Sequence, residues 1–243
     1  MQITKHEIDS QVLGRAILEL SGPYDPELAR LEHDYVQAHQ PRYVVNKAPI
    51  EDIATIQRLE DHGFRFVETQ LRLTFRLRRP FDTGKTPYLF ERVTTEDQLR
   101  EVLEIAAHTF TDDRFLVDPE LPDASQVSSA RYQAYVRQSF ARPDERVYRL
   151  VNPALGRTVA FKTHRMVSSE EALLLLGGVH ADYKSAGLAP INAYHEFNEL
   201  LQHGVKRFTT HVSARNYAVM NLEIGGFQYR IKQTFVVLRK IYP

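Results

Sequence analysis

The most apolar run of the chain, residues 173–179, is followed at once by a polar loop and then by a helix. The loop contains the small residues Ser185 and Gly187, and Pro190 suits a first helical turn, where a missing N–H does no harm. Apolar residues at three- and four-residue steps predict a buried helical face over 188–203. Such a turn presents the free N–H groups and the positive end of the helix dipole. The sequence therefore predicts a strand–loop–helix unit that can cradle a phosphate.

Strands and helices alternate along the whole chain. Strands are predicted at 15–21, 43–46, 64–77, 89–93, 147–151, 158–165, 172–179, 208–212 and 228–239, and helices at 26–39, 50–62, 95–108, 125–140, 188–203 and 216–224. The two strands flanking Ser168 and Ser169 are joined by a tight turn, which predicts an antiparallel hairpin. The fold class expected from this order is mixed α/β (α+β).

Two domains are expected, one over 1–80 and one over 88–243. Residues 81–87 between them contain Pro and Gly without apolar periodicity, which is typical of a linker. The two parts share a phrase, since Leu-Glu-Asp-His-Gly-Phe at 59–64 aligns with Leu-Glu-Ile-Gly-Gly-Phe at 222–227. The phrase is either a chance recurrence of a helix ending at glycine or the sign of a repeated unit. We favour the repeated unit.

Composition excludes several classes of function. Lys plus Arg is 31 and Asp plus Glu is 31, so the chain lacks the basic excess of a nucleic-acid-binding protein. It has no cysteine, which excludes disulfides, thiolate zinc sites and cysteine nucleophiles. Its histidines are scattered, and no metal site is predicted. The N-terminus does not look like a signal peptide, and no apolar run has the ~20 residues of a membrane span. We expect a cytoplasmic protein with no nucleic-acid or membrane partner.

Two motifs resemble those of the GNAT superfamily of N-acetyltransferases. Residues 179–189 are similar to its acetyl-CoA signature, in which a strand ends in a valine-like residue and a loop with Arg or Gln, Gly, and Gly or Ala follows. Residues 216–227 are similar to its second signature, an Asn, a helix, and Gly-Phe opening the last strand. The order of elements over 89–239 also agrees. The resemblance implies a GNAT fold with a central, mostly antiparallel twisted sheet, preceded here by a truncated GNAT-like domain.

The resemblance implies acetyl-CoA as co-substrate and a set of residues that hold it. These are Val179, Lys184, Ser185, Ala186, Gly187, Leu188, Ala189 and Asn216. Lys184 stands where Arg or Gln is usual in the family. A lysine keeps a positive charge near the phosphates but cannot donate the two parallel hydrogen bonds of an arginine. Leu222 stands where many members carry a tyrosine that protonates the departing thiolate. This departure leaves open whether the chain is an enzyme or a catalytically silent module that binds acetyl-CoA or a partner.

Acetyl transfer to an amine needs a group that removes a proton, because aliphatic amines titrate near ~10. His180 follows one strand and His211 lies on the next, and imidazole suits proton transfer near neutral pH. Each could equally be structural. Tyr217 is either a displaced acid or a packed aromatic residue. In the family the oxyanion donor is a backbone N–H at the end of this strand, here around 178–180.

The layout also resembles the WecD-like acetyltransferases, which modify the amino group of a nucleotide-linked amino-deoxysugar. These proteins have a phrase like Phe-Thr-Asp-Asp-Arg-Phe at 110–115 where acceptors bind. The resemblance implies substrate contacts from Arg114, Phe115 and Tyr132, although a surface arginine and two structural aromatic residues are the competing interpretation. An antibiotic, a polyamine or a carrier-bound amine are the other acceptors considered. The N-terminal part either packs on the catalytic sheet or supplies the surface of a homodimer.

Overall fold

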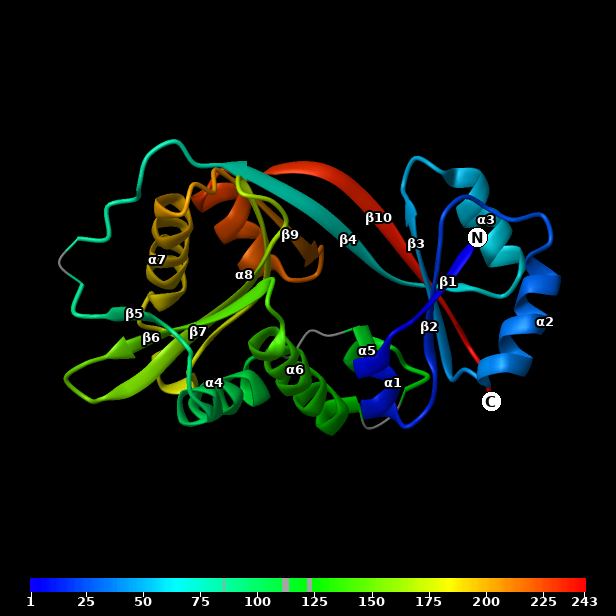
Figure 1. The fold of residues 1–243 in the computed structure, drawn as a ribbon. Coiled ribbons are helices and arrows are strands. Elements are labelled where there is room, and N and C mark those ends of the chain that lie inside the picture. The colour runs from blue at the N-terminus through cyan, green and yellow to red at the C-terminus, as the bar shows by residue number, and fades with distance from the viewer. Residues whose placement is uncertain (85, 111–113, 122–123) are drawn as a thin grey trace.

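One ten-stranded sheet with helices on both faces forms the molecule (Figure 1). The structure, a computed structural model, describes residues 1–84, 86–110, 114–121 and 124–243. The strands are β1 (Gln2–Lys5), β2 (Ile17–Ser21), β3 (Tyr43–Pro49), β4 (Arg65–Arg76), β5 (Leu89–Arg92), β6 (Glu145–Asn152), β7 (Arg157–Met166), β8 (Glu171–Val179), β9 (Arg207–Ser213) and β10 (Arg230–Ile241). The helices are α1 (Glu7–Leu13), α2 (Leu28–His39), α3 (Ile53–Asp61), α4 (Glu96–Thr109), α5 (Arg114–Val117), α6 (Ala124–Ala141), α7 (Leu188–Gln202) and α8 (Tyr217–Met220), with a 3-10 turn η1 (Ala181–Tyr183) and a π-helix η2 (Asn221–Gly226).

The elements predicted from periodicity are confirmed, with ends shifted by a few residues. α4 begins as its sequence predicts, because the Thr95 side chain accepts a hydrogen bond from the Gln98 N–H and the Gln98 side-chain oxygen accepts one from the Thr95 N–H. β7 and β8 form the expected antiparallel hairpin. The last predicted helix differs in type from the prediction, because only its first turn, α8, is α-helical and the chain then continues as the π-helix η2.

Sequence reasoning missed β1, α1 and α5. α1 has seven residues and its N-cap residue, His6, makes no side-chain cap hydrogen bond, so no start signal marks it. β1 is a four-residue edge strand with little buried surface, and α5 is a single turn. These elements exist because neighbouring elements pack against them. Within the described ranges, no helix is both long enough and apolar enough to cross a membrane.

The order across the sheet is β1-β2-β3-β10-β4-β9-β8-β7-β6-β5, and it reveals an exchange of strands. The repeated phrase precedes β4 in one half and β10 in the other. β10 pairs antiparallel with β3, whereas β4 pairs antiparallel with β9, and β4 and β10 pair with each other. Each half therefore completes its sheet with the last strand of the other half. The division into domains at 81–87 stays a prediction, and the sheet runs continuously across it.

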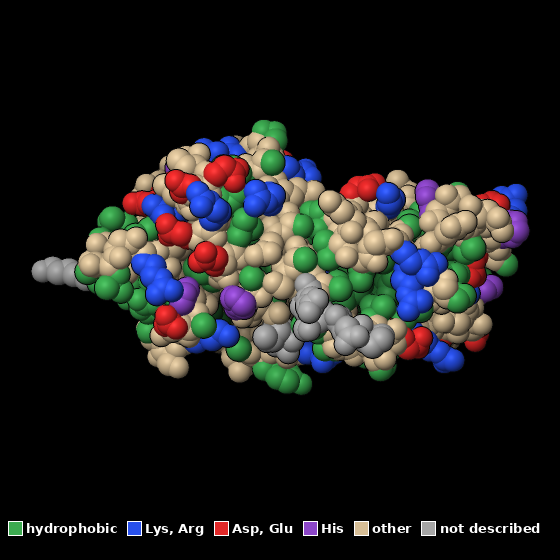
Figure 2. All heavy atoms as spheres, turned by 90° about the horizontal axis from the view of Figure 1, so that it is seen from below, with side chains coloured by type: hydrophobic (Ala, Val, Ile, Leu, Met, Phe, Trp, Pro, Cys, Tyr) green, Lys and Arg blue, Asp and Glu red, His purple; other side chains and the backbone are tan. Residues whose placement is uncertain are grey.

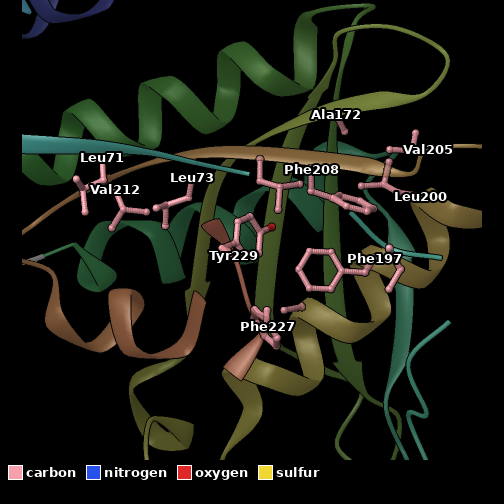
Figure 3. Close-up of a cluster of buried hydrophobic side chains, with 13 residues drawn as sticks. Leu71, Leu73, Ala172, Phe197, Leu200, Val205, Phe208, Val212, Phe227 and Tyr229 are labelled. Carbon is pink, nitrogen blue, oxygen red and sulfur yellow. The ribbon is translucent and has the colours of Figure 1, made fainter. Parts of the chain in front are cut away.

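The helices divide between the two faces of the sheet. Figure 1 shows α1, α4, α5 and α6 on one side of the sheet and α2, α3, α7 and α8 on the other. The largest core cluster lies between α7, β4, β9 and the start of β10, where Phe197, Phe208, Phe227 and Tyr229 meet (Figure 3). Aromatic rings at this density bury a large apolar area, which fixes α7 against the sheet. The position of α7 in turn sets the position of the loop that precedes it.

Candidate functional site

β8 and β9 separate in the middle of the sheet. They pair in parallel only from Glu171 and Arg207 to Leu174 and Thr210, although both strands continue beyond those residues. A register shift between β7 and β8 after Thr163 bulges β8 at the same point. The remaining part of β8 is therefore bonded on one side only, and a gap in the sheet opens between it and β9.

The open edge of β8 can supply backbone donors. The His180 N–H donates to the Val159 carbonyl at 2.8 Å, so it is not free, which corrects part of the expectation for 178–180. Because successive N–H groups alternate in direction along a strand, those of Gly177 and Val179 point away from β7. They point to the side where β9 has left, and a carbonyl oxygen placed in the gap can accept from them.

Two glycines allow β8 to lie close to its neighbours. A Cβ atom at Gly178 would stand 2.6 Å from Phe161 Cε1 and 2.7 Å from Thr109 Oγ1. A Cβ atom at Gly177 would stand 2.8 Å from Lys162 Cδ on the other face. The strand end is therefore clamped between α4 and the Lys162 side chain. This close packing holds the open edge of β8 in a defined position.

Gly178→Ala should destabilise the protein by about 1–3 kcal/mol, because the added methyl group overpacks a rigid contact between Phe161 and α4. Urea unfolding of the variant against the wild type measures this loss. Gly225→Ala is the matched control, since a Cβ atom at Gly225 would meet nothing within 4 Å. Equal midpoints for the two variants would show that β8 can move away from α4 freely.

The loop between β8 and α7 has the open, small-residue character that an anion cradle needs. Lys184, Ser185, Ala186, Gly187 and Ala189 are exposed. Gly187 is the N-cap of α7, with φ of 67°, and a Cβ atom there would meet nothing within 4 Å. Leu188 is the exception, because its side chain is buried in the core. Its backbone alone can face a ligand.

A cleft of about 290 Å³ lies between α4 and the end of β8. Its lining residues are Glu104, Ile105, His108, Val179, His180 and Ala181. The ring of His180 is held from two sides, since Arg157 Nη2 donates to Nε2 at 2.7 Å and the Asp182 N–H lies 3.2 Å from Nδ1. A role as a free base would require His180 to leave Arg157. His211 is not among the lining residues of this cleft.

His211 lies on β9 and is exposed. Its direct partner across the strands is Arg72 of β4. The surrounding protein still removes water from part of the ring, and this desolvation, followed by the charges of Lys47 and Arg72, lowers the pKa of His211 below its ordinary value of 6.5. The imidazole is therefore neutral at pH 7 and has a lone pair that can accept a proton.

Tyr217 and Asn216 lie at the start of α8. The Tyr217 side chain is 73% exposed and packs in no core cluster, so the packed interpretation of Tyr217 is wrong. Asn216 caps the helix by accepting a hydrogen bond from the Val219 N–H at 3.1 Å. This cap is the structural role expected for Asn216, and a contact with coenzyme A stays a prediction.

Glu223, which follows Leu222, is a buried acid that sequence reasoning missed. Leu222 packs against the largest core cluster, whereas the Glu223 carboxylate lies near Lys162, Glu196 and Tyr229. Burial, partly offset by Lys162, raises the pKa of Glu223 to about 7. Within the described part of the chain, its Oε2 is buried and has no hydrogen-bond partner. The only sequence signal was its place beside the tyrosine-equivalent position, and the π-helix that orients it was not foreseeable.

Two of the three predicted acceptor residues, Arg114 and Phe115, contact strands of the N-terminal half, and Tyr132 lies on α6. Arg114 Nε is 3.5 Å from Glu68 Oε1, and its side chain is 13% exposed. Phe115 is buried with its ring 5.2 Å from that of Tyr43. Tyr132 stacks on Phe110 with ring centroids 3.9 Å apart. Residues 111–113 of the predicted phrase lie outside the described residues.

Comparison with known proteins identifies the fold. No protein-family profile and no curated protein sequence matches the chain. A GCN5-related N-acetyltransferase from Sphaerobacter thermophilus superposes with a TM-score of 0.68 and 15% identity over 93% of this chain and 73% of that one. A tandem GNAT protein from the clavulanic acid biosynthesis pathway gives 0.65 and 14% over 93% and 76%, and a GCN5-related N-acetyltransferase from Kribbella flavida gives 0.61 and 14% over 94% and 82%. The chain thus has the GNAT fold, as its two motifs predict.

Proposed function

We propose that the protein transfers an acetyl group from acetyl-CoA to the amine of a small substrate. The observation that carries this proposal is the gap between β8 and β9, which opens beside a small-residue loop at the start of α7. A gap with free N–H groups suits a thioester carbonyl, and the adjoining helix start suits a pyrophosphate. A long ligand with an acyl group at one end and phosphates at the other requires both of these features.

The residues of the loop fit the phosphates of acetyl-CoA. Gly187 leaves the space over the start of α7 open, and Ser185 and Ala186 are small and exposed. Backbone N–H groups at the start of a helix have no partner within it and donate to phosphate oxygens. Lys184, also exposed, adds a positive charge to the same loop. We assign phosphate contacts also to the backbones of Leu188 and Ala189. Val179, at the end of β8, contacts the cofactor through its N–H at the acyl carbonyl instead.

Two titratable groups suit the proton transfers of this reaction. The amine nitrogen forms a bond to the thioester carbon, and the carbon–sulfur bond breaks. His211, neutral at pH 7, accepts the proton that the amine loses. Glu223, buried and carrying a proton up to about pH 7, donates one to the departing thiolate in place of the missing tyrosine. The amine proton passes on from His211 to solvent, and Glu223 is reprotonated from solvent.

The acceptor that we favour is a nucleotide-linked amino-deoxysugar. Its phosphates need cations, and Arg114 lies at the face where α5 meets β4. On the described part of that face basic, acidic and apolar side chains intermingle (Figure 2), so an anion must be held by a few specific cations. A polycationic amine would need clustered carboxylates instead. Binding by a silent module remains the second candidate, and Leu222 is the observation that favours it.

Calorimetric titration of acetyl-CoA tests the proposal directly. We expect micromolar binding to the wild type and none to Gly187→Glu, because the glutamate places a negative charge where the phosphates lie. Gly187→Asn is the matched control, since Asn tolerates the positive φ of 67° and adds no charge. It should still bind. A folded wild type that binds no acetyl-CoA would rule out the acetyltransferase, and binding without turnover of any amine would favour the silent module.

A further inference from the structure

The strand exchange places a residue of the N-terminal half beside the candidate base. Arg72 lies on β4, directly opposite His211 on β9, and its side chain is half-buried. We propose that Arg72, assisted by Lys47 and Arg114, binds an anionic group of the acceptor, a phosphate or a carboxylate. The assignment of this anion to the acceptor rests on the proposed function, whereas the anion site itself rests on the geometry alone. The N-terminal half would then complete the substrate site.

Arg72 lacks the partner that a half-buried guanidinium needs. Its Nε is buried and has no hydrogen-bond partner among the residues that the structure describes. Across the described residues, no ion pair or side-chain hydrogen bond involves Arg72, whereas Arg114 and Lys47 each have a carboxylate. A buried donor left unpaired is unfavourable, and in native proteins it usually marks a place where a ligand or water binds. The guanidinium is a rigid fork of donors that matches the two oxygens of a carboxylate or phosphate.

Lys47 and Arg114 each form an ion pair with a carboxylate, whereas Arg72 forms none with any described residue. Lys47 Nζ is 3.4 Å from Glu19 Oε2, and Arg114 Nε is 3.5 Å from Glu68 Oε1. Glu19 is also bound by His6, whose Nε2 lies 2.9 Å from its Oε2. Glu19 and Glu68 are therefore already paired with other cations, and neither is the ion-pair partner of Arg72.

The three cations act on one region of the sheet. Glu68 and Arg72 are four residues apart on β4 and so face the same side of the sheet. The charges of Lys47 and Arg72 both act on His211, and Arg114 acts on Lys47. An anion bound by Arg72 lies next to the imidazole across the strand. The acceptor that fits has its anionic group near its amine.

His211 reports on this site whether or not the protein is an enzyme. We would follow its imidazole by NMR across pH, with the resonance assigned by His211→Gln. Arg72→Gln should raise the pKa of His211, because one of the two neighbouring cations is removed. Arg76→Gln on the same strand is the matched control, since Arg76 is exposed and lies opposite Arg207 rather than His211. It should leave the titration of His211 unchanged.

Inorganic pyrophosphate and acetate serve as probes of the two anion classes. We expect pyrophosphate or acetate to shift the wild-type His211 resonance and raise its pKa, with affinity at least tenfold weaker in Arg72→Gln. The probe that binds identifies the source as phosphate or carboxylate. Arg72→Lys keeps the charge but loses the fork, and should weaken binding several-fold even if Arg72→Gln does not fold. A His211 titration that ignores both probes would overturn the anion site. A wild type that binds no acetyl-CoA but whose His211 resonance still responds to an anion would overturn the proposed function alone.

Discussion

Glu223→Gln should stabilise the protein by roughly 3 kcal/mol at pH 8 and by less than about 1 kcal/mol at pH 5. The pKa of Glu223 is about 7 in the folded protein, against 4.5 for an ordinary glutamate. The folded state therefore keeps a proton that the unfolded chain releases, so wild-type stability falls as pH rises from 4.5 to about 7 and then levels off. Glutamine is neutral at every pH and removes this loss.

Urea unfolding of both proteins from pH 5 to 8.5 measures the effect. The difference between the two curves isolates Glu223, because the other titrating groups are common to both. Glu60→Gln is the control, since Glu60 is exposed and should give a curve parallel to that of the wild type. A constant difference across the pH range would show that Glu223 is ionised throughout. If the proposed acetyl transfer is the reaction, the same substitution should lower kcat more than it changes KM, because under that proposal Glu223 is a proton donor rather than a binding contact.

Asp118→Asn should destabilise the protein by about 3 kcal/mol, because the buried Arg239 guanidinium loses the charged group that binds it twice and keeps only the exposed Glu120 carboxylate. Asp118 Oδ2 and Oδ1 accept from Arg239 Nε at 2.6 Å and Nη2 at 2.9 Å. The two residues are only 4% and 5% exposed. This pair joins the segment after α5 to β10 within the N-terminal part of the sheet, so we expect it to hold the exchanged strand in place.

A double-mutant cycle with Arg239→Met separates the pair from its surroundings. The double variant should recover part of the loss, because no unpaired charge stays buried. Asp144→Asn is the surface comparison, since Asp144 and its partner Arg142 are 40% and 43% exposed, and its effect on stability should be much smaller than that of Asp118→Asn. Additive losses at Asp118 and Arg239 would mean that the two side chains do not depend on each other.

Local chemistry made several features predictable. Thr95 and Gln98 form the capping box that marks the start of α4. The pairing of β7 with β8 needs only a tight turn between strands adjacent in the sequence. Gly187 stands at the start of α7 in the left-handed conformation that suits it. Each of these depends on residues that are close in sequence, where propensity and capping decide the outcome.

The candidate site depends on contacts between residues that are far apart in the sequence, and the sequence does not show which of these residues become neighbours. His211 was found as a candidate, but Arg72, its direct neighbour, was not, because the two residues belong to different predicted domains. Glu223 was overlooked because its burial follows from a π-helical turn and from packing against α7. Arg114 was placed near an acceptor by resemblance, and the structure adds its ion pair with Glu68.

The sequence alone indicated the order of all strands and helices except β1, α1 and α5, the loop before α7, and the phrase shared by residues 59–64 and 222–227, because these follow from periodicity and turn residues. Only the tertiary structure decided which strand completes each half. β4 and β10 both follow the same Gly-Phe phrase and carry similar patterns, so either could pair with β3 or β9. Strand pairing over long separations is settled by packing and by buried partners such as Asp118 and Arg239. That choice brings Arg72 to His211.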